Sequence, residues 1–159
     1  KNLQKEFCCF LDGWQAKEHH LRLMRWAQQY AVPVLTTNFD ETLSDCAGLQ
    51  LHHTDGVRFT DFYPWSSYFA AQAINDPAQE FAIWHINGIK RYSRSIRLGL
   101  SHYMGSVERA RALIHKGGDK RLYSEKHQGQ WNGCSTWLQC IFNNDLVFVG
   151  LGSGLAGLI

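Results

Sequence analysis

Apolar side chains recur at intervals of three and four residues between residues 17 and 31, which is the spacing of one face of an α-helix. Leu23, Ala27, Tyr30 and Ala31 fall on that face. Pro33 stops the helix, because a proline disfavours the helical conformation of the residue before it. The pattern therefore predicts an amphipathic helix that ends just before residue 33.

The apolar run that follows, residues 32–35, predicts a short buried strand, and a helical stretch at 41–47 closes on Gly48. Residues 49–68 are aromatic and rich in turns and predict a loop with short strands. Strands are predicted at 81–86 and 95–100, and helices at 103–115 and 136–142. The continuous apolar run at 145–152 ends in glycines and is the clearest parallel-strand pattern of the chain. Helix, buried strand, polar turn and helix in succession are typical of an α/β fold.

Composition agrees with one ordinary globular domain over residues 1–159. Hydrophobic residues make up 45% and charged residues 19%, and the net charge of +2 attracts no particular class of partner. No apolar run approaches the roughly 20 residues of a membrane helix, so we expect a cytoplasmic protein. The five cysteines contain no C-x-x-C, which argues against a disulfide framework and against a four-thiolate zinc site.

Ligands of open α/β sheets bind beyond the carboxyl ends of the strands. That rule selects residues 36–40 and 150–153, where small side chains and glycines let backbone amides approach a ribose or a phosphate. Each segment also has a plainer interpretation. Asn38 and Glu41 have the spacing of a capping box, Asp40 could cap the next helix, and a G-x-G is often only a turn.

The combination of segments is more specific. Thr36-Thr37-Asn38-Phe39-Asp40 resembles the T-x-N-x-D segment of the sirtuin superfamily, especially of bacterial sirtuin-like NAD hydrolases. Ile83-Trp84-His85-Ile86-Asn87-Gly88-Ile89 is similar to the family's H-x-H-G segment, residues 95–103 to the part that follows it, and residues 146–153 to its late strand and ribose-binding turn. The resemblance implies a Rossmann-like three-layer fold, with a parallel sheet and a helical insertion, that takes NAD as its substrate.

The resemblance also implies the site. Asn38 would be the catalytic amide, and cleavage of the nicotinamide–ribose bond through an oxocarbenium-like state gives it a sensible task, since a fixed amide can position a water or a ribose hydroxyl. Asp40 would orient the ribose or the loop. The remaining cofactor-binding residues would be Thr36, Thr37, Gly150, Gly152 and Ser153.

The chain departs from the family pattern in three places. Asn87 stands where the family has its catalytic histidine, and His85 lies two residues upstream. Either His85 does the catalytic work, or the activity is low, or the domain binds without cleaving. The paired C-x-x-C motifs of protein-deacylating sirtuins are missing, which favours the zinc-free hydrolase branch. The family's Gly-rich first strand would precede Lys1, so we expect a domain truncated at its N-terminus.

Family resemblance further implies a role in bacterial anti-phage defence and assembly into a homo-oligomer or with a defence partner. Two other classes stay open: an inactive module that binds a nucleotide or a partner, and a nucleic-acid-binding domain. The nucleic-acid-binding domain would use residues 90–126, which contain ten Lys and Arg residues and only three acidic residues. Arg109 and Arg111, however, fit the solvated face of a helix better. The neighbouring pair His19 and His20 is interpreted as solvated or capping.

Overall fold

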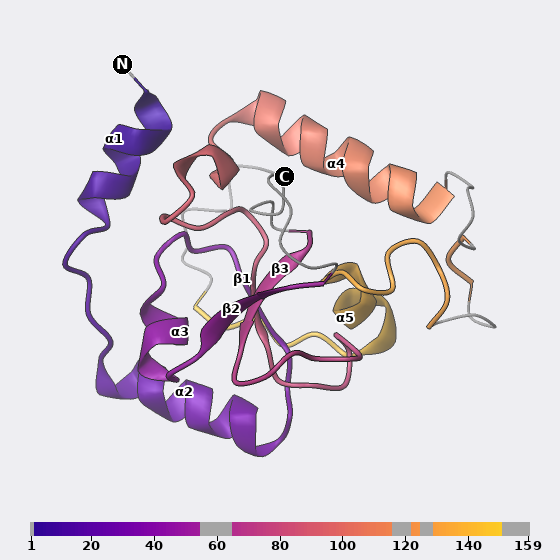
Figure 1. The fold of residues 1–159 in the computed structure, drawn as a ribbon, viewed down its shortest axis with the longest axis horizontal. Coiled ribbons are helices and arrows are strands. Elements are labelled where there is room, and N and C mark those ends of the chain that lie inside the picture. Colours follow the sequence, from indigo (N-terminus) through magenta and orange to yellow (C-terminus); the bar gives the residue numbers. More distant parts are fainter. Residues whose placement is uncertain (1, 55–64, 116–121, 125–128, 151–159) are drawn as a thin grey trace.

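The computed structural model describes residues 2–54, 65–115, 122–124 and 129–150, and every structural statement below concerns these residues. Four helices of more than five residues, one shorter α-helix, one 3-10 turn and four short strands alternate along them (Figure 1). In chain order these are α1 (Leu3–Phe10), α2 (Glu18–Gln29), β1 (Val34–Thr36), α3 (Thr42–Cys46), β2 (Gln50–His53), β3 (Ser67–Ala70), β4 (Ile83–His85), η1 (Ser93–Ser95), α4 (Leu100–His115) and α5 (Leu138–Asn143).

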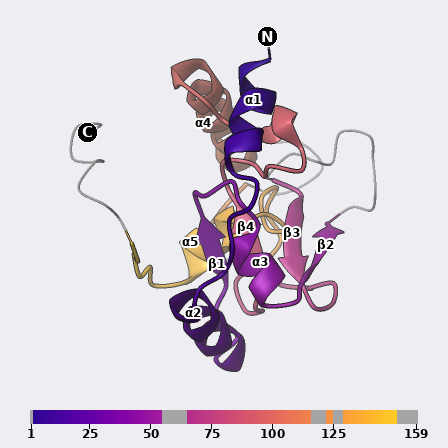
Figure 2. The ribbon, with the colours of Figure 1, turned by 90° about the vertical axis from the view of Figure 1, so that its left-hand side faces the viewer.

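The four strands form one open sheet in the order β1-β4-β3-β2 (Figure 2). β1 and β4 are parallel, with Thr36 opposite His85 in the register, whereas β4 pairs with β3 and β3 with β2 in antiparallel fashion. The predicted α/β class is confirmed. The predicted parallel sheet is wrong for the described strands, because β3 runs antiparallel to both of its neighbours. β2 and the first half of β3 lie within residues 49–68, where the sequence predicted a loop with short strands.

The two faces of the sheet carry different parts of the core. On one face Met24 of α2, Phe69, Ile83 and Ile89 form a cluster, against which Leu43 of α3 packs. On the other face Tyr68, Ala70, Ala82 and Trp84 pack with Trp137, which precedes α5. Successive side chains of β4 therefore point to opposite faces, as a pleated strand requires, and this places His85 on the face that α2 and α3 cover.

Most predicted elements are confirmed within the usual uncertainty of their ends. The helices predicted at 17–31, 41–47, 103–115 and 136–142 correspond to α2, α3, α4 and α5, and the strands predicted at 32–35 and 81–86 correspond to β1 and β4. Gly48 follows α3 with a φ of +65°, which is the left-handed conformation that ends many helices.

The strand predicted at 95–100 is wrong. Ser95 ends η1, and its hydroxyl donates to the carbonyl of Tyr92 at 2.7 Å and accepts the N–H of Ile89 at 2.9 Å. Gly88 makes this close packing possible, since a Cβ there would lie 2.3 Å from the Ser95 carbonyl oxygen and its φ of +106° suits only glycine. Local hydrogen bonds of the serine thus replace a strand ladder.

The strand predicted at 145–152 is also wrong where the structure describes it. Residues 145–150 have no regular secondary structure, and Val147 and Phe148 are 82% and 74% exposed. A continuous apolar run predicts a strand only when neighbours bury both of its faces, and no described strand lies beside this one. Residues 151 and 152 lie outside the described part.

Two further contacts bring the N-terminal helix to the sheet's carboxyl edge. The Gln4 side chain donates from Nε2 to the carbonyl of Ile96 at 2.7 Å, and the rings of Phe7 and Phe39 meet edge to face at 5.5 Å.

α4 and α5 share a separate cluster around the buried Trp131, with Trp65, Leu113 and Leu138. Among the helices of the described residues none has the length and apolar character needed to cross a bilayer.

Candidate functional site

The turn after β1 and the turn after β4 lie against each other at one edge of the sheet. Because the two strands are parallel, both turns leave from the same end. Two backbone hydrogen bonds join them, from the N–H of Ile86 to the carbonyl of Thr36 at 3.0 Å and from the N–H of Lys90 to that of Phe39 at 2.8 Å. The two motif segments, 47 residues apart at Asn38 and His85, are thus neighbours in space, as the rule for parallel strands predicts.

Within the first turn, side chains fold back on the backbone. The buried hydroxyl of Thr36 accepts the N–H of Asn38 at 3.1 Å, while Thr37 and Asn38 are exposed. Asp40 is buried, and its Oδ1 accepts the N–H of Thr42 at 3.1 Å. Asp40 thus bonds the first N–H of α3, although Glu41 and not Asp40 is the N-cap residue of that helix. The capping-box interpretation is wrong for the pair of Asn38 and Glu41, because the Glu41 carboxylate accepts from Arg91 instead.

His85 is buried behind Asn38, with 3% of its surface exposed. Its Nδ1 lies 2.9 Å from the backbone carbonyl of Asn38. A carbonyl only accepts, so Nδ1 carries the proton of the neutral ring and Nε2 keeps its lone pair. Burial lowers the pKa of His85, and the hydrogen bond to Asn38 offsets this only in part. The ring is therefore neutral near pH 7, and among the described residues its Nε2 has no hydrogen-bond partner.

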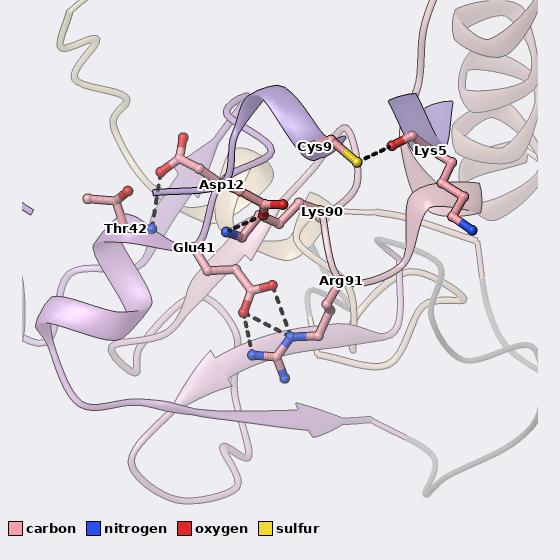
Figure 3. Close-up of polar contacts among 8 residues, drawn as sticks. Lys5, Cys9, Asp12, Glu41, Thr42, Lys90 and Arg91 are labelled. Carbon is pink, nitrogen blue, oxygen red and sulfur yellow. Dashed lines mark hydrogen bonds and ion pairs between the residues drawn. The ribbon is translucent and has the colours of Figure 1, made fainter. Parts of the chain in front are cut away.

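An ion pair that the sequence did not predict, between Glu41 and Arg91, lies near His85. Arg91 donates from Nε to Oε1 and Oε2 of Glu41 at 2.9 and 2.8 Å and from Nη2 to Oε2 (Figure 3). The Glu41 side chain is 5% exposed and that of Arg91 44%. The guanidinium also lies 5.2 Å from the centre of the Phe69 ring, which in turn meets the His85 ring edge to face at 5.5 Å. The hydrogen bond to Glu41 raises the pKa of Arg91, so the guanidinium stays charged.

A hollow of about 370 Å³ opens on the same side of the sheet. Asn38 and Asp40 both line it, which brings together two of the residues that the resemblance selected. The rest of its wall is made of Trp14, Gln15, Lys17, His20, Thr42 and Leu43. A larger hollow of about 640 Å³, lined by residues that include Asp76, Gln139 and Asp145, contains no predicted site residue.

The other predicted site residues lie outside this hollow. Neither His85 nor Asn87 lines it. Asn87 is half-buried, and its carbonyl accepts the N–H of Arg97 at 2.9 Å. Gly150 is exposed with a φ of +72°, and apart from its chain neighbours no described atom lies within 4 Å of an added Cβ. Gly152 and Ser153 lie outside the described residues.

No group of three His, Cys, Asp or Glu side chains able to hold a metal ion occurs in the described ranges, and the absence of zinc stays a prediction. The five cysteines, all described, are free thiols. Comparisons of the chain with protein-family models, with curated proteins and with solved structures give no match in any of the three.

Proposed function

We propose that the chain hydrolyses NAD at the nicotinamide–ribose bond, with a Rossmann-like three-layer fold of the sirtuin-like, zinc-free kind. The observation that carries the proposal is the position of Asn38. It lines an open hollow together with Asp40, and its backbone is held by His85 from the neighbouring parallel strand. A polar amide in a fixed turn at the carboxyl edge of a sheet suits the positioning of a reacting water.

In the proposed reaction the bond between the anomeric carbon and the nicotinamide nitrogen breaks, and its electron pair leaves with nicotinamide. A water held by the Asn38 amide forms the new bond to that carbon, and the proton that it loses passes to the bulk water to which the hollow is open. Asp40 accepts a hydrogen bond from a ribose hydroxyl with the carboxylate oxygen that Thr42 does not use. Oriented polar groups of this kind stabilise the oxocarbenium-like state.

His85 has one defined contact in this scheme, the hydrogen bond to the Asn38 carbonyl. That contact supports a positioning role, in which the ring holds the catalytic amide in place. Its neutral ring with a free Nε2 lone pair is also the form that a general base requires, and a base role for His85 stays a prediction because the ring does not line the hollow.

A second candidate function is an inactive module that binds a nucleotide without cleaving it. The position of Asn87 favours it, since an amide stands where the family has its histidine and neither Asn87 nor His85 reaches the wall of the hollow. We further propose, from the resemblance alone, that the protein acts in the cytoplasm in anti-phage defence, as a homo-oligomer or with a defence partner.

The proposal is tested by measuring, with chromatography, the rate at which the protein releases nicotinamide from NAD. Asn38→Ala should lower turnover by about 10²–10³-fold, the effect typical of removing one positioned polar group from a reacting centre. Asn75→Ala changes an exposed asparagine far along the chain from the motif and is the matched control, with turnover unchanged. Wild-type turnover that survives Asn38→Ala would refute the assignment. NAD that binds and stays intact would instead establish the second candidate.

A further inference from the structure

The hollow beside Asn38 has a second wall that the proposed function does not use. Trp14 lies in the segment between α1 and α2, Lys17 immediately precedes α2, and His20 belongs to its first turn. All three line the same hollow as Asn38 and Asp40. The sequence pattern set His20 aside as solvated or capping, so its position in this wall is a finding of the structure.

The side chain of His20 is oriented by a backbone contact. The N–H of Lys17 donates to Nδ1 of His20 at 2.9 Å. Nδ1 is therefore an acceptor, and the neutral ring carries its hydrogen on Nε2. This leaves His20 as a hydrogen-bond donor in the same wall of the hollow as Lys17, and both side chains suit an anion with several acceptor oxygens.

The other lining groups suit the remaining parts of a nucleotide. Trp14 is 62% exposed, so its ring is free to stack on a planar base. Asp40 accepts a hydrogen bond from a ribose hydroxyl and the Asn38 amide holds the attacking water, as proposed above. A volume of about 370 Å³ lies near the lower end of the range of about 300–1,000 Å³ for small-molecule pockets, which fits one nucleotide better than two.

We propose that this hollow recognises a mononucleotide unit through its phosphate, with Lys17 and His20 on the phosphate and Trp14 on the base. This inference rests on the proposed function, and it assigns the nicotinamide mononucleotide half of NAD to the hollow. Lys17, His20 and Trp14 thereby determine specificity: an otherwise identical nucleoside without a phosphate binds more weakly.

Isothermal titration calorimetry with two probes, nicotinamide mononucleotide and nicotinamide riboside, tests the phosphate contact. The wild-type chain should bind the mononucleotide about tenfold more tightly, which corresponds to one charge-assisted contact at a partly exposed site. Lys17→Gln should reduce this ratio to near one by weakening only the mononucleotide. His20→Gln should also reduce it, and glutamine at this helix position can still accept the Lys17 N–H. Arg25→Gln, on the same helix, is the matched control and should leave the ratio unchanged.

Trp14→Ala should weaken both probes to a similar extent, because each carries the same base, whereas Trp26→Ala, an exposed tryptophan of α2 outside the hollow, should weaken neither. Equal affinities of the wild type for the two probes, no binding of either, or equal effects of Lys17→Gln and Arg25→Gln would each overturn the inference. The failures are distinguishable. Phosphate-dependent binding without nicotinamide release from NAD contradicts only the proposed hydrolysis, and hydrolysis that Lys17→Gln and His20→Gln leave unaltered contradicts only the hollow's assignment.

Discussion

Replacing Arg91 by methionine leaves the Glu41 carboxylate in a buried position without its cation. The substitution removes the three hydrogen bonds that join the two side chains and the contact of the guanidinium with the Phe69 ring. Methionine keeps much of the aliphatic length, so the main loss is electrostatic. Because Glu41 follows the Asn38 turn and Arg91 follows the His85 turn, the pair also ties together the two loops of the candidate site.

The magnitude follows from burial. Removing one partner of a fully buried ion pair costs about 3–5 kcal/mol, because the remaining charge stays uncompensated. The Glu41 side chain is 5% exposed and meets that condition, but the Arg91 side chain is 44% exposed, so water already screens the pair. We therefore expect Arg91→Met to lower the free energy of unfolding by about 2–3 kcal/mol, including about 0.5–1 kcal/mol for the ring contact.

Urea denaturation followed by tryptophan fluorescence measures this loss. With a slope of about 2 kcal/mol per molar, the midpoint should fall by about 1–1.5 M while the slope stays constant. Arg94→Met removes an exposed arginine three residues away and should change stability by less than about 0.5 kcal/mol. Adding Glu41→Gln to Arg91→Met should restore part of the loss, because a neutral amide replaces the orphaned charge. Equal midpoints for Arg91→Met and Arg94→Met would refute the reasoning.

Three further predictions concern His85 and Asn87. Burial lowers the pKa of His85, so this side chain binds a proton more readily in the unfolded chain than in the folded one. The free energy of unfolding should therefore fall as pH drops below about 6.5, the ordinary histidine value. Denaturation of His85→Gln should show a smaller fall over the same pH range. If His85 only positions Asn38, His85→Gln should retain NAD turnover through its amide N–H. If it is the base, the loss should reach about 10²–10⁴-fold. Asn87→His should raise nicotinamide release if Asn87 marks a lost catalytic position, and an unchanged rate would exclude that interpretation.

Local periodicity was enough to predict a helix with one buried apolar face or a strand made of a short buried apolar run. α2 is an example, since Met24 and Ala27 are buried on the face that the spacing selects. The strand patterns at 95–100 and 145–150 failed because an apolar run carries no information about its neighbours. Ser95 found backbone partners nearby, and Val147 has no described strand beside it. A strand needs a partner strand to satisfy its backbone hydrogen bonds, and that partner lies elsewhere in the sequence.

The same distinction applies to the site. The meeting of the Thr36 and His85 ends was predictable, because parallel strands share an edge. The pairing of Glu41 with Arg91 was not, since 50 residues separate them and Glu41 had a plausible local partner. A signal existed in the position of Arg91, which lies soon after the second motif as Glu41 directly follows the first, but charge alone does not select one arginine from a basic stretch.

Capping and ligand binding were alternatives for Asp40, and His20 was interpreted as solvated or capping, whereas in the structure each side chain both contacts the local backbone and lines the hollow. Asp40 uses one oxygen for the Thr42 N–H and still lines the hollow, and His20 accepts the Lys17 N–H on one nitrogen while the other carries a hydrogen. The backbone contact restricts the rotamers before any ligand arrives, which lowers the entropy lost on binding. A side chain that caps a helix with one atom is therefore well suited to hold a ligand with the other. Substitutions that preserve the capping atom, such as His20→Gln, can separate the two contributions, whereas alanine removes both.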